Sequence, residues 1–374
     1  MSSTISPLIK LSREYGSDPE YVLAGGGNTS CKDGDTLYVK ASGTTLASLD
    51  EAGLVRMSLR ALDAIWDRSY PSDTARREEE VLKDLLNARE KGETKRPSVE
   101  ALLHAVLPQK YVVHLHPALV NGLTCSREGE HAACRLFGDA MLWIPLVNPG
   151  YILAAEVRKR LAGYRAKHSG EPECILLQNH GVFVGGDTVA EVRRRYDSLL
   201  GTIRSAIRRF PDLTPRTVAP SRREVIEKEM RAVNTNAPQG IVSLTNAELA
   251  GFLSDEEHAA PISSAFTPDH IVYSGFRPLW VPETVFDGSV SFRDLYAAYA
   301  AESGTAPKSV LVQHTGVFTY GETALALLLD TVKVAVYAES FGGALFMSAE
   351  QVDFIRTWEV EQYRAAVGTG TVAE

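Results

Sequence analysis

Two histidines separated by one residue, His114 and His116, end an apolar run of the chain, and His180 follows a second apolar run. Side chains two residues apart on a β-strand project from the same face, so one metal ion can contact both imidazoles of the pair. Three imidazoles from two extended segments suit a catalytic zinc, which typically takes three protein ligands and leaves one position open. An isolated His-x-His pair is also compatible with ordinary polar side chains, so the surrounding residues decide between the two interpretations.

An acidic residue, Glu100, precedes the histidine pair in a segment predicted to be helical. Ser98 is the expected N-cap, and no glycine or proline interrupts the following run until Pro108. Glu100 then falls in the first turn, and His104 lies one turn later on the same face. A carboxylate near a metal-bound substrate can act as a general base or an extra ligand. The alternative is structural, because the helix dipole favours an acidic residue in a first turn in any case.

A glycine-rich segment lies near the N-terminus. Residues 23–30 contain three consecutive glycines followed by Asn-Thr-Ser, and residues 37–44 end in Ala-Ser-Gly-Thr. Glycines let the backbone approach a ligand closely, and exposed amides with short polar side chains suit a phosphate. The spacing is neither the Gly-x-Gly-x-x-Gly of dinucleotide-binding proteins nor a P-loop. By itself, such a run is most often a turn between two strands.

The order of these motifs resembles that of a known family. The motifs are Gly-Asn-Thr-Ser at 27–30, Ala-Ser-Gly-Thr at 41–44, Pro-Ser-x-Glu-x-x-x-His at 97–104, His-x-His at 114–116 and Leu-Leu-Gln-x-His-Gly at 176–181. Together they resemble the class II aldolase and adducin family, which includes fuculose-phosphate and rhamnulose-phosphate aldolases. The resemblance implies an α/β fold with three layers, α/β/α, around a mixed, mainly antiparallel central sheet.

The same resemblance implies a role for each matching residue. A divalent metal, usually zinc, would be bound by His114, His116 and His180. Glu100 would be the acid/base residue. The phosphate pocket would be lined by Asn28, Ser42, Gly43 and Ser98. Fuculose-phosphate aldolase has a second serine before the glutamate where this chain has Val99, so part of that contact differs here. Those aldolases also use tyrosines of a neighbouring subunit, which implies a homo-oligomer, although no tyrosine of this chain is matched to that role.

A narrower resemblance extends over most of the chain. Residues 8–13, 23–30 and 268–273 resemble the N-terminal part of bifunctional rhamnulose-phosphate aldolase/alcohol dehydrogenase proteins. In those proteins a short-chain dehydrogenase domain follows the aldolase part. The present sequence contains no Gly-x-Gly-x-x-Gly, so we expect neither that domain nor its activity in this chain.

Composition and charge agree with an enzyme that acts on a small substrate. The 374 residues include 39 Lys and Arg against 47 Asp and Glu, and the net charge of -8 argues against a nucleic-acid partner. Four cysteines without a Cys-x-x-Cys pair are too sparse for a disulfide scaffold. The N-terminus lacks the basic start and apolar core of a signal peptide, and no apolar run could span a bilayer. The sequence therefore predicts a cytoplasmic protein with no membrane partner.

The chain is expected to form two domains. Residues 1–210 hold every predicted site residue, and residues 211–220 contain three prolines and are interpreted as a linker. Residues 221–374 echo the first part, because 307–323 repeats the pattern of 172–188, each copy being interpreted as a strand, a bend and a helix. Thr315 stands in the place of His180, and residues 272–277 are taken as the stretch comparable to the His-x-His pair. We therefore predict a smaller, degenerate aldolase-like half without metal ligands; convergence of a common motif is the alternative.

The expected function is that of a metal-dependent carbon-carbon lyase. The resemblance implies cleavage of a phosphorylated ketose or deoxyketose, such as rhamnulose or fuculose 1-phosphate, to dihydroxyacetone phosphate and an aldehyde. Sugar-phosphate epimerases and a dehydratase resemble the same family and are alternatives. A non-catalytic, adducin-like scaffold is the alternative from a different class, and the presence of all three histidines with Glu100 argues against it.

Overall fold

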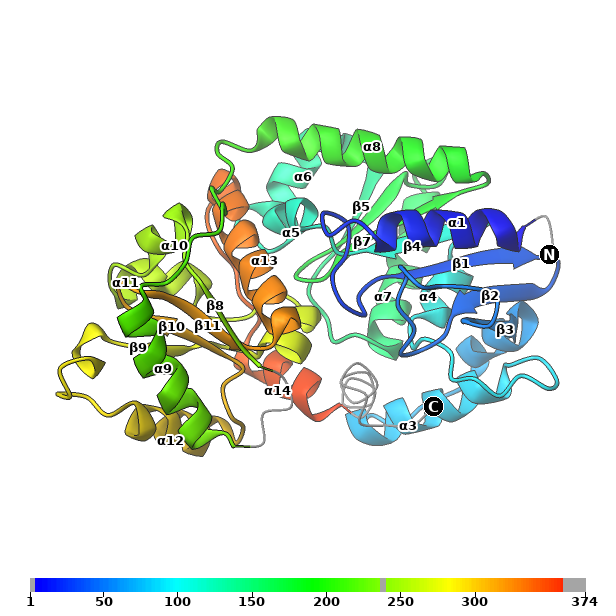
Figure 1. The fold of residues 1–374 in the computed structure, drawn as a ribbon. Coiled ribbons are helices and arrows are strands. Elements are labelled where there is room, and N and C mark those ends of the chain that lie inside the picture. The colour runs from blue at the N-terminus through cyan, green and yellow to red at the C-terminus, as the bar shows by residue number, and fades with distance from the viewer. Residues whose placement is uncertain (1–3, 236–239, 359–374) are drawn as a thin grey trace. The chain divides into compact units, whose positions relative to one another are not determined.

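The computed structural model describes residues 4–235 and 240–358, and Figure 1 shows it as a ribbon. Its contacts group the chain into two compact units. The first comprises Met1–Thr124, Glu128–Ala206 and the stretch from Asp353 onward, and the second comprises Cys125–Arg127 and Ile207–Val352. None of the helices in the described ranges is both long and apolar enough to cross a membrane. All four cysteines are free thiols.

A seven-stranded sheet forms the centre of the first unit. Its strands are β1 (Asn28–Asp33), β2 (Thr36–Lys40), β3 (Leu54–Ser58), β4 (Tyr111–Leu115), β5 (Met141–Ile144), β6 (Cys174–Leu177) and β7 (Gly181–Gly186). They are ordered β3-β2-β1-β4-β7-β6-β5, and every neighbouring pair is antiparallel except β5 with β6. The expected mixed, mainly antiparallel central sheet is confirmed.

Helices cover both faces of this sheet. They are α1 (Ile5–Gly16), α2 (Leu59–Asp63), α3 (Thr74–Asn87), α4 (Ala101–Val106), α5 (Ala118–Thr124), α6 (Gly129–Phe137), α7 (Tyr151–Arg165) and α8 (Val189–Ala206). Helices α1 and α8 lie on one face, and α4 and α7 lie on the other, which gives three layers (Figure 1). All five residues of β4 are buried, because a central strand covered on both faces has no solvent side. The strand that carries His114 is therefore interior.

Local sequence explains where the long helix α8 begins. Thr188 Oγ1 accepts a hydrogen bond from the backbone N–H of Glu191 at 3.1 Å. The Glu191 carboxylate reaches back to accept from the N–H of Asp187 at 3.0 Å. These two bonds resemble a capping box, with the Glu191 carboxylate accepting from the residue before Thr188. It ends β7 and turns the chain back over the sheet.

One apolar core cluster of the first unit lies between the sheet and the layer that contains α4 and α7. Inward-facing residues of β2 and β4, among them Val39 and Val112, meet Leu102 and Leu103 of α4 and Val157 of α7. Each of these side chains is almost fully buried. Since α4 is only six residues long, its position depends on this packing rather than on its own helical propensity.

The second unit contains a four-stranded sheet in the order β8-β11-β10-β9. Its strands are β8 (Ile241–Leu244), β9 (Leu279–Val281), β10 (Ser309–Val312) and β11 (Gly316–Tyr320). Its helices are α9 (Pro220–Val233), α10 (Ala247–Phe252), α11 (Glu256–Ala259), α12 (Phe292–Ser303) and α13 (Glu322–Ala338), and α14 (Ala349–Thr357) follows at the boundary with the first unit. Apolar residues of α9, α12 and this sheet form its core.

Two details of the expected repeat are wrong. A second strand, β7 or β11, separates the bend from the helix in each copy, because the Gly-Val-Phe run after the bend is β-branched and aromatic. The stretch 272–277 is not the counterpart of the His-x-His strand, since His270–Ser274 is a π-helical turn. The strand that pairs with β11 as β4 pairs with β7 is β8.

Candidate metal centre

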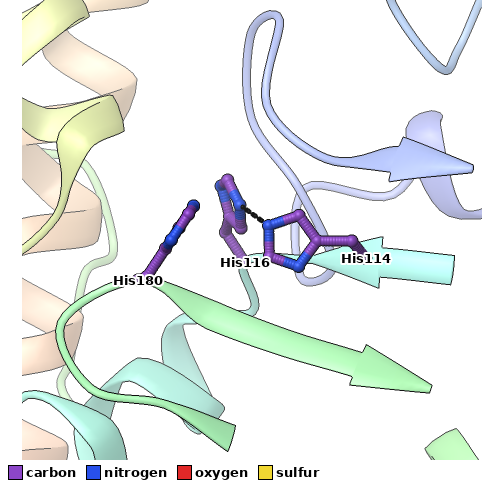
Figure 2. A group of neighbouring side chains, drawn as sticks. All are labelled: His114, His116 and His180. Carbon is purple, nitrogen blue, oxygen red and sulfur yellow. Dashed lines mark hydrogen bonds between the residues drawn. The ribbon is translucent and has the colours of Figure 1, made fainter. Parts of the chain in front are cut away.

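Three histidines converge at one end of the central sheet of the first unit. One ligand atom from each of His114, His116 and His180 lies within 4.8 Å of the others. His114 is on β4, His116 directly follows that strand, and His180 is in the turn that leads into β7 (Figure 2). The structure thus brings together the three residues proposed from the sequence as metal ligands. This group could hold a metal ion.

The backbone around His180 explains how it reaches the other two. Asn179 adopts a left-handed conformation with φ of 55°, which turns the chain out of β6. At Gly181 a side chain would not fit, because a Cβ atom there would lie 2.5 Å from the carbonyl oxygen of Leu115 and 2.6 Å from the His116 ring. The absence of a side chain at this glycine therefore lets β7 approach the end of β4 closely enough for the imidazoles to meet.

The ring of His114 is held in one orientation. Its Nδ1 lies 3.0 Å from the carbonyl oxygen of Val182, and Phe183 stacks on the ring with centroids 4.1 Å apart and planes 11° apart. A carbonyl can only accept, so the neutral ring carries its proton on Nδ1 and presents the Nε2 lone pair to the site. A second bond that fixes the tautomer is typical of metal-ligating histidines.

The donor set fits a divalent cation. His114 Nε2 lies 2.8 Å from His116 Nε2 and 3.2 Å from Glu100 Oε1 (Figure 2 shows the two imidazoles). Since His114 Nε2 is an acceptor, two lone pairs and a carboxylate at these separations need a proton or a cation among them. Imidazole and carboxylate are also the ligand types that zinc accepts. The histidines therefore suit a metal, with Glu100 beside it.

Glu100 occupies a different place in its helix from the predicted one. Helix α4 begins at Ala101, so Glu100 is its N-cap residue rather than part of its first turn, and Ser98 Oγ accepts from the Glu100 N–H at 3.2 Å. The expectation that Ser98 caps the helix is wrong, because the Ser98 hydroxyl bonds two residues ahead and keeps the chain from entering the helix there. The Glu100 side chain is left to face the imidazoles.

The imidazoles control the ionisation of Glu100. Its Oε1 lies 3.2 Å from His114 Nε2 and 3.6 Å from His180 Nε2, and its side chain is 15% exposed. Burial by itself would raise the pKa of Glu100, but the positive charge that a proton brings to the surrounding imidazoles, His114 foremost, holds that pKa well below its usual range. Glu100 is thus a largely buried, ionised carboxylate beside the histidines, in the protonation state that a general base requires.

One face of β1 supports Glu100 and its helix, and sequence reasoning missed most of it. Asn28 Nδ2 donates to Glu100 Oε2 at 3.4 Å, and Ser30 Oγ bonds to His104 Nδ1 at 2.7 Å. Burial lowers the pKa of His104 to about 3, so this imidazole is neutral. Lys32 continues the same face. Polar residues at alternate positions of a buried strand are the signal that could have identified this row.

Lys32 anchors the C-terminal end of α4. Its buried ammonium, whose pKa is lowered to about 8 by burial, donates to three backbone carbonyls at 2.8, 2.6 and 3.0 Å: His104, Leu107 and Gln109. Lys32→Met should lower the free energy of unfolding by about 2 kcal/mol, because those carbonyls lose a charged donor. Urea unfolding measures the change. Lys91→Met, at an exposed turn, is the matched control, and equal unfolding midpoints for the two variants would contradict this role.

The residues expected to bind phosphate lie on neighbouring segments. A backbone bridge joins Ala41 to Pro97, and the N–H of Ser42 donates to the Arg96 carbonyl at 2.9 Å. The segment that carries Ser42 and Gly43 is therefore side by side with the segment that carries Ser98. Gly43 has a φ of 84°, a conformation that favours glycine. Asn28, the fourth residue expected to bind phosphate, lies beside Glu100 and donates to it. The Asn28 Oδ1 atom is buried without a hydrogen-bond partner.

Solved structures of other proteins are similar to about half of this chain. Among solved structures, the N-terminal class II aldolase domain of a conserved protein from Thermoplasma acidophilum is 28% identical, and the match covers 55% of this chain and 94% of that one with a TM-score of 0.47. An L-fuculose-1-phosphate aldolase from Thermus thermophilus is 16% identical, with coverage of 54% and 92% and a TM-score of 0.33.

A relative that matches nearly the whole chain is known by sequence. The Bacillus subtilis protein named uncharacterized oxidoreductase YuxG is 24% identical in an alignment 411 positions long, gaps included, that covers 96% of this chain. The chain spans 58% of the length of that relative. The family model of the class II aldolase and adducin N-terminal domain matches residues 7–205, more than half of the 374 residues and the whole of the site described above. The chain therefore belongs to the class II aldolase and adducin family.

Proposed function

We propose that this protein is a metal-dependent aldolase that cleaves a phosphorylated ketose, such as rhamnulose or fuculose 1-phosphate, to dihydroxyacetone phosphate and an aldehyde. The observation that carries the proposal is the ionised Glu100 carboxylate, which lies 3.2 Å from His114 and 3.6 Å from His180 in the histidine cluster. A scaffold protein has no need for a buried base beside three imidazoles. An aldolase needs this combination to move a proton beside an electrophile.

The three histidines are assigned as ligands of a divalent metal, most simply Zn²⁺. Bound there, the metal would polarise the carbonyl and neighbouring hydroxyl oxygens of the ketose and lower the energy of the developing negative charge. Its ligands are preset by the protein. His114 is oriented by the Val182 carbonyl and the Phe183 ring, and Gly181 admits the close approach of the two strands.

Glu100 is assigned as the acid/base residue. In the cleavage direction it takes the proton from the hydroxyl group of the carbon that becomes the aldehyde carbon, which is one of the two carbons of the bond that breaks. The carbon-oxygen bond of that group becomes the aldehyde, and the electron pair of the broken bond passes to the ketose fragment as an enediolate. Glu100 then returns its proton to the enediolate carbon that was released when the bond broke, which gives dihydroxyacetone phosphate. Asn28, which donates to Glu100 Oε2 at 3.4 Å, holds the carboxylate in position for these transfers.

The phosphate is assigned to the segments that carry Ser42, Gly43 and Ser98, with Asn28 at the side of Glu100. Support comes from the backbone bridge between Ala41 and Pro97, which keeps the two segments together. Short hydroxyl side chains and free amides can bind a phosphate locally even though the chain has a net charge of -8. Removal of these hydroxyls would raise KM more than it would lower kcat if they bind ground state and transition state alike.

A wider assignment rests on the long relative. We propose that this chain corresponds to the aldolase part of bifunctional rhamnulose-1-phosphate aldolase/alcohol dehydrogenase proteins and acts as a cytoplasmic homo-oligomer. The similarity along nearly the whole chain to a protein named as an oxidoreductase, of whose length the chain spans 58%, supports this correspondence. No redox step is assigned to the residues described here.

The test is a panel of ketose 1-phosphates, assayed for release of dihydroxyacetone phosphate with and without a chelator. We expect release from at least one deoxyketose 1-phosphate, loss of the activity in chelator and its return on addition of Zn²⁺. A product with unchanged carbon number would show an epimerase, and loss of water would show a dehydratase. Absence of any turnover, together with absence of bound metal in the purified protein, would favour the scaffold alternative.

A further inference from the structure

The sheet of the second unit repeats one half of the sheet of the first. The order β8-β11-β10-β9 has the same pairing directions as β4-β7-β6-β5, because β9 is parallel to β10 as β5 is to β6 and the other neighbours are antiparallel. Helix α9 packs on α12 as α4 packs on α7, and α13 packs on β11 as α8 packs on β7. Along the chain, the order of α-helices and strands from α9 to α13 is the order from α4 to α8.

The two copies also agree in backbone conformation at the bend. β6 pairs with β7 and β10 pairs with β11 in the same register, offset by 135 residues. The middle residue of the bend is left-handed in both, with φ of 55° at Asn179 and 52° at His314. Neither residue is glycine, and a generic hairpin does not require this costly conformation at a residue with a side chain. The shared geometry thus extends beyond the common strand-turn-strand motif.

A glutamine makes the same pair of hydrogen bonds in each copy. The backbone N–H of Gln178 donates to the last carbonyl of β5 at 3.0 Å, and its Oε1 accepts from the N–H of Leu146 at 3.0 Å. In the second unit the N–H of Gln313 donates to the last carbonyl of β9 at 2.9 Å, and its Oε1 accepts from the N–H of Glu283 at 3.1 Å. Both glutamines fasten the parallel strand to the bend.

The ligand positions of the first unit are changed in the second. Ser243 pairs with Phe318 as His114 pairs with Phe183, so Ser243 stands at the place of His114. The places of the three histidines are taken, in chain order, by Ser243, Thr245 and Thr315. Neutral hydroxyl groups are poor ligands for zinc compared with imidazole. The copy therefore retains the backbone of the metal centre without its donors.

In the second unit, Arg222 contacts Thr315, the counterpart of the ligand position His180. Arg222, in the first turn of α9, donates from Nη1 to Thr315 Oγ1 at 3.0 Å and to the His314 carbonyl at 3.4 Å, and its Nη2 pairs with the Glu283 carboxylate. The second oxygen of Glu283 lies 2.8 Å from His314 Nδ1. Glu100 reaches the histidines from the corresponding helix start, so a guanidinium takes the place of that carboxylate.

We infer that the second unit is an internal copy of the metal-binding half of the first, and that the Arg222 guanidinium has replaced the metal as the cation that joins the helix start to the bend. Arg222 links the helix start to the bend through Thr315, as Glu100 and a metal would in the first unit. Its second contact, to Glu283 after β9, has no counterpart in the first unit. A fixed positive charge at this place also repels a divalent cation. The inference does not depend on the proposed substrate or reaction.

The first test measures where metal binds in the protein as it exists. We expect one equivalent of Zn²⁺ or Co²⁺ per chain in the unaltered protein and none in the His114→Ala/His116→Ala variant, because the second unit takes no metal. Elemental analysis after gel filtration provides the count. A second equivalent that survives in the double variant would overturn the inference.

The second test restores the lost site in that double variant. Arg222→Glu, Ser243→His, Thr245→His and Thr315→His together copy the donors of the first unit onto the second. We expect the variant to bind one Co²⁺ with the visible absorption of a tetrahedral site. The same three histidines with Arg222 retained are the matched control, and they should bind Co²⁺ about tenfold more weakly because of the guanidinium charge.

A folded variant, as judged by circular dichroism, that binds no more Co²⁺ than its double-variant parent would overturn the inference, because the backbone copy would then not place the donors around one point. If the fourfold change prevents folding, the smaller set Arg222→Glu, Thr245→His and Thr315→His leaves Ser243 in β8 unaltered. Two imidazoles and a carboxylate should still give measurable Co²⁺ binding that the version with Arg222 lacks. Equal binding by these two versions would contradict the assigned role of Arg222.

Discussion

The His180→Ala protein is expected to lose its metal and its cleavage activity together. His180 contributes one of the three imidazoles whose ligand atoms lie within 4.8 Å of one another, and two imidazoles hold a divalent cation far less tightly than three. Without the cation, stabilisation of the developing negative charge is lost, and kcat/KM should fall by about a thousandfold or more, which corresponds to about 4 kcal/mol. Elemental analysis and the aldolase assay on the same preparation measure both effects.

The control for this variant is His131→Ala. His131 is exposed on α6, outside the cluster, and its loss should leave metal content and rate unchanged. Circular dichroism should be the same for both variants, because His180 lies in a turn. Full retro-aldol activity in a metal-free His180→Ala protein would refute the proposed role of the site.

Glu100→Gln is expected to separate catalysis from metal binding. The amide has the shape of the carboxylate and can keep its contact with Asn28, but it cannot accept the substrate proton. General base catalysis contributes about a hundredfold to ten-thousandfold, so kcat should fall within that range while metal content stays close to that of the unaltered protein. Steady-state kinetics with elemental analysis distinguishes the two quantities.

Glu130→Gln provides the matched change, since Glu130 is an exposed residue of α6. Two results would count against Glu100 as the base. An unchanged kcat would show that another group moves the proton. A parallel loss of metal and rate would show that Glu100 is mainly a ligand, as its 3.2 Å distance from His114 Nε2 would permit.

The histidine pair of the candidate metal centre could be predicted from the sequence because its signals are local. Strand alternation places His114 and His116 on one face, and the β-branched run before them marks the strand. The third candidate, His180, was marked only by its place after a second apolar run, and nothing in its own segment shows that β7 pairs with β4. The helix start near Glu100 was misplaced because the Ser98 hydroxyl competes with the backbone for hydrogen bonds, and pattern reasoning does not resolve that competition.

The long-range contacts that support the site could not be predicted from the sequence. Ser30 and Lys32 act on His104 and the carbonyls after it, more than 70 positions along the chain, and only the register of β1 with β4 brings them there. The second copy was recognised only at its hairpin. β8 escaped notice because its residues are only partly buried and carry none of the histidines that mark β4.

The hydrogen bond between His114 and the Val182 carbonyl also has a kinetic consequence. This bond and the stacked Phe183 ring orient the imidazole through contacts of the protein alone, so the ligand needs no reorientation to bind a metal. Metal uptake then requires the ion to shed water but does not require the chain to refold. Metal binding at the proposed site should therefore be fast.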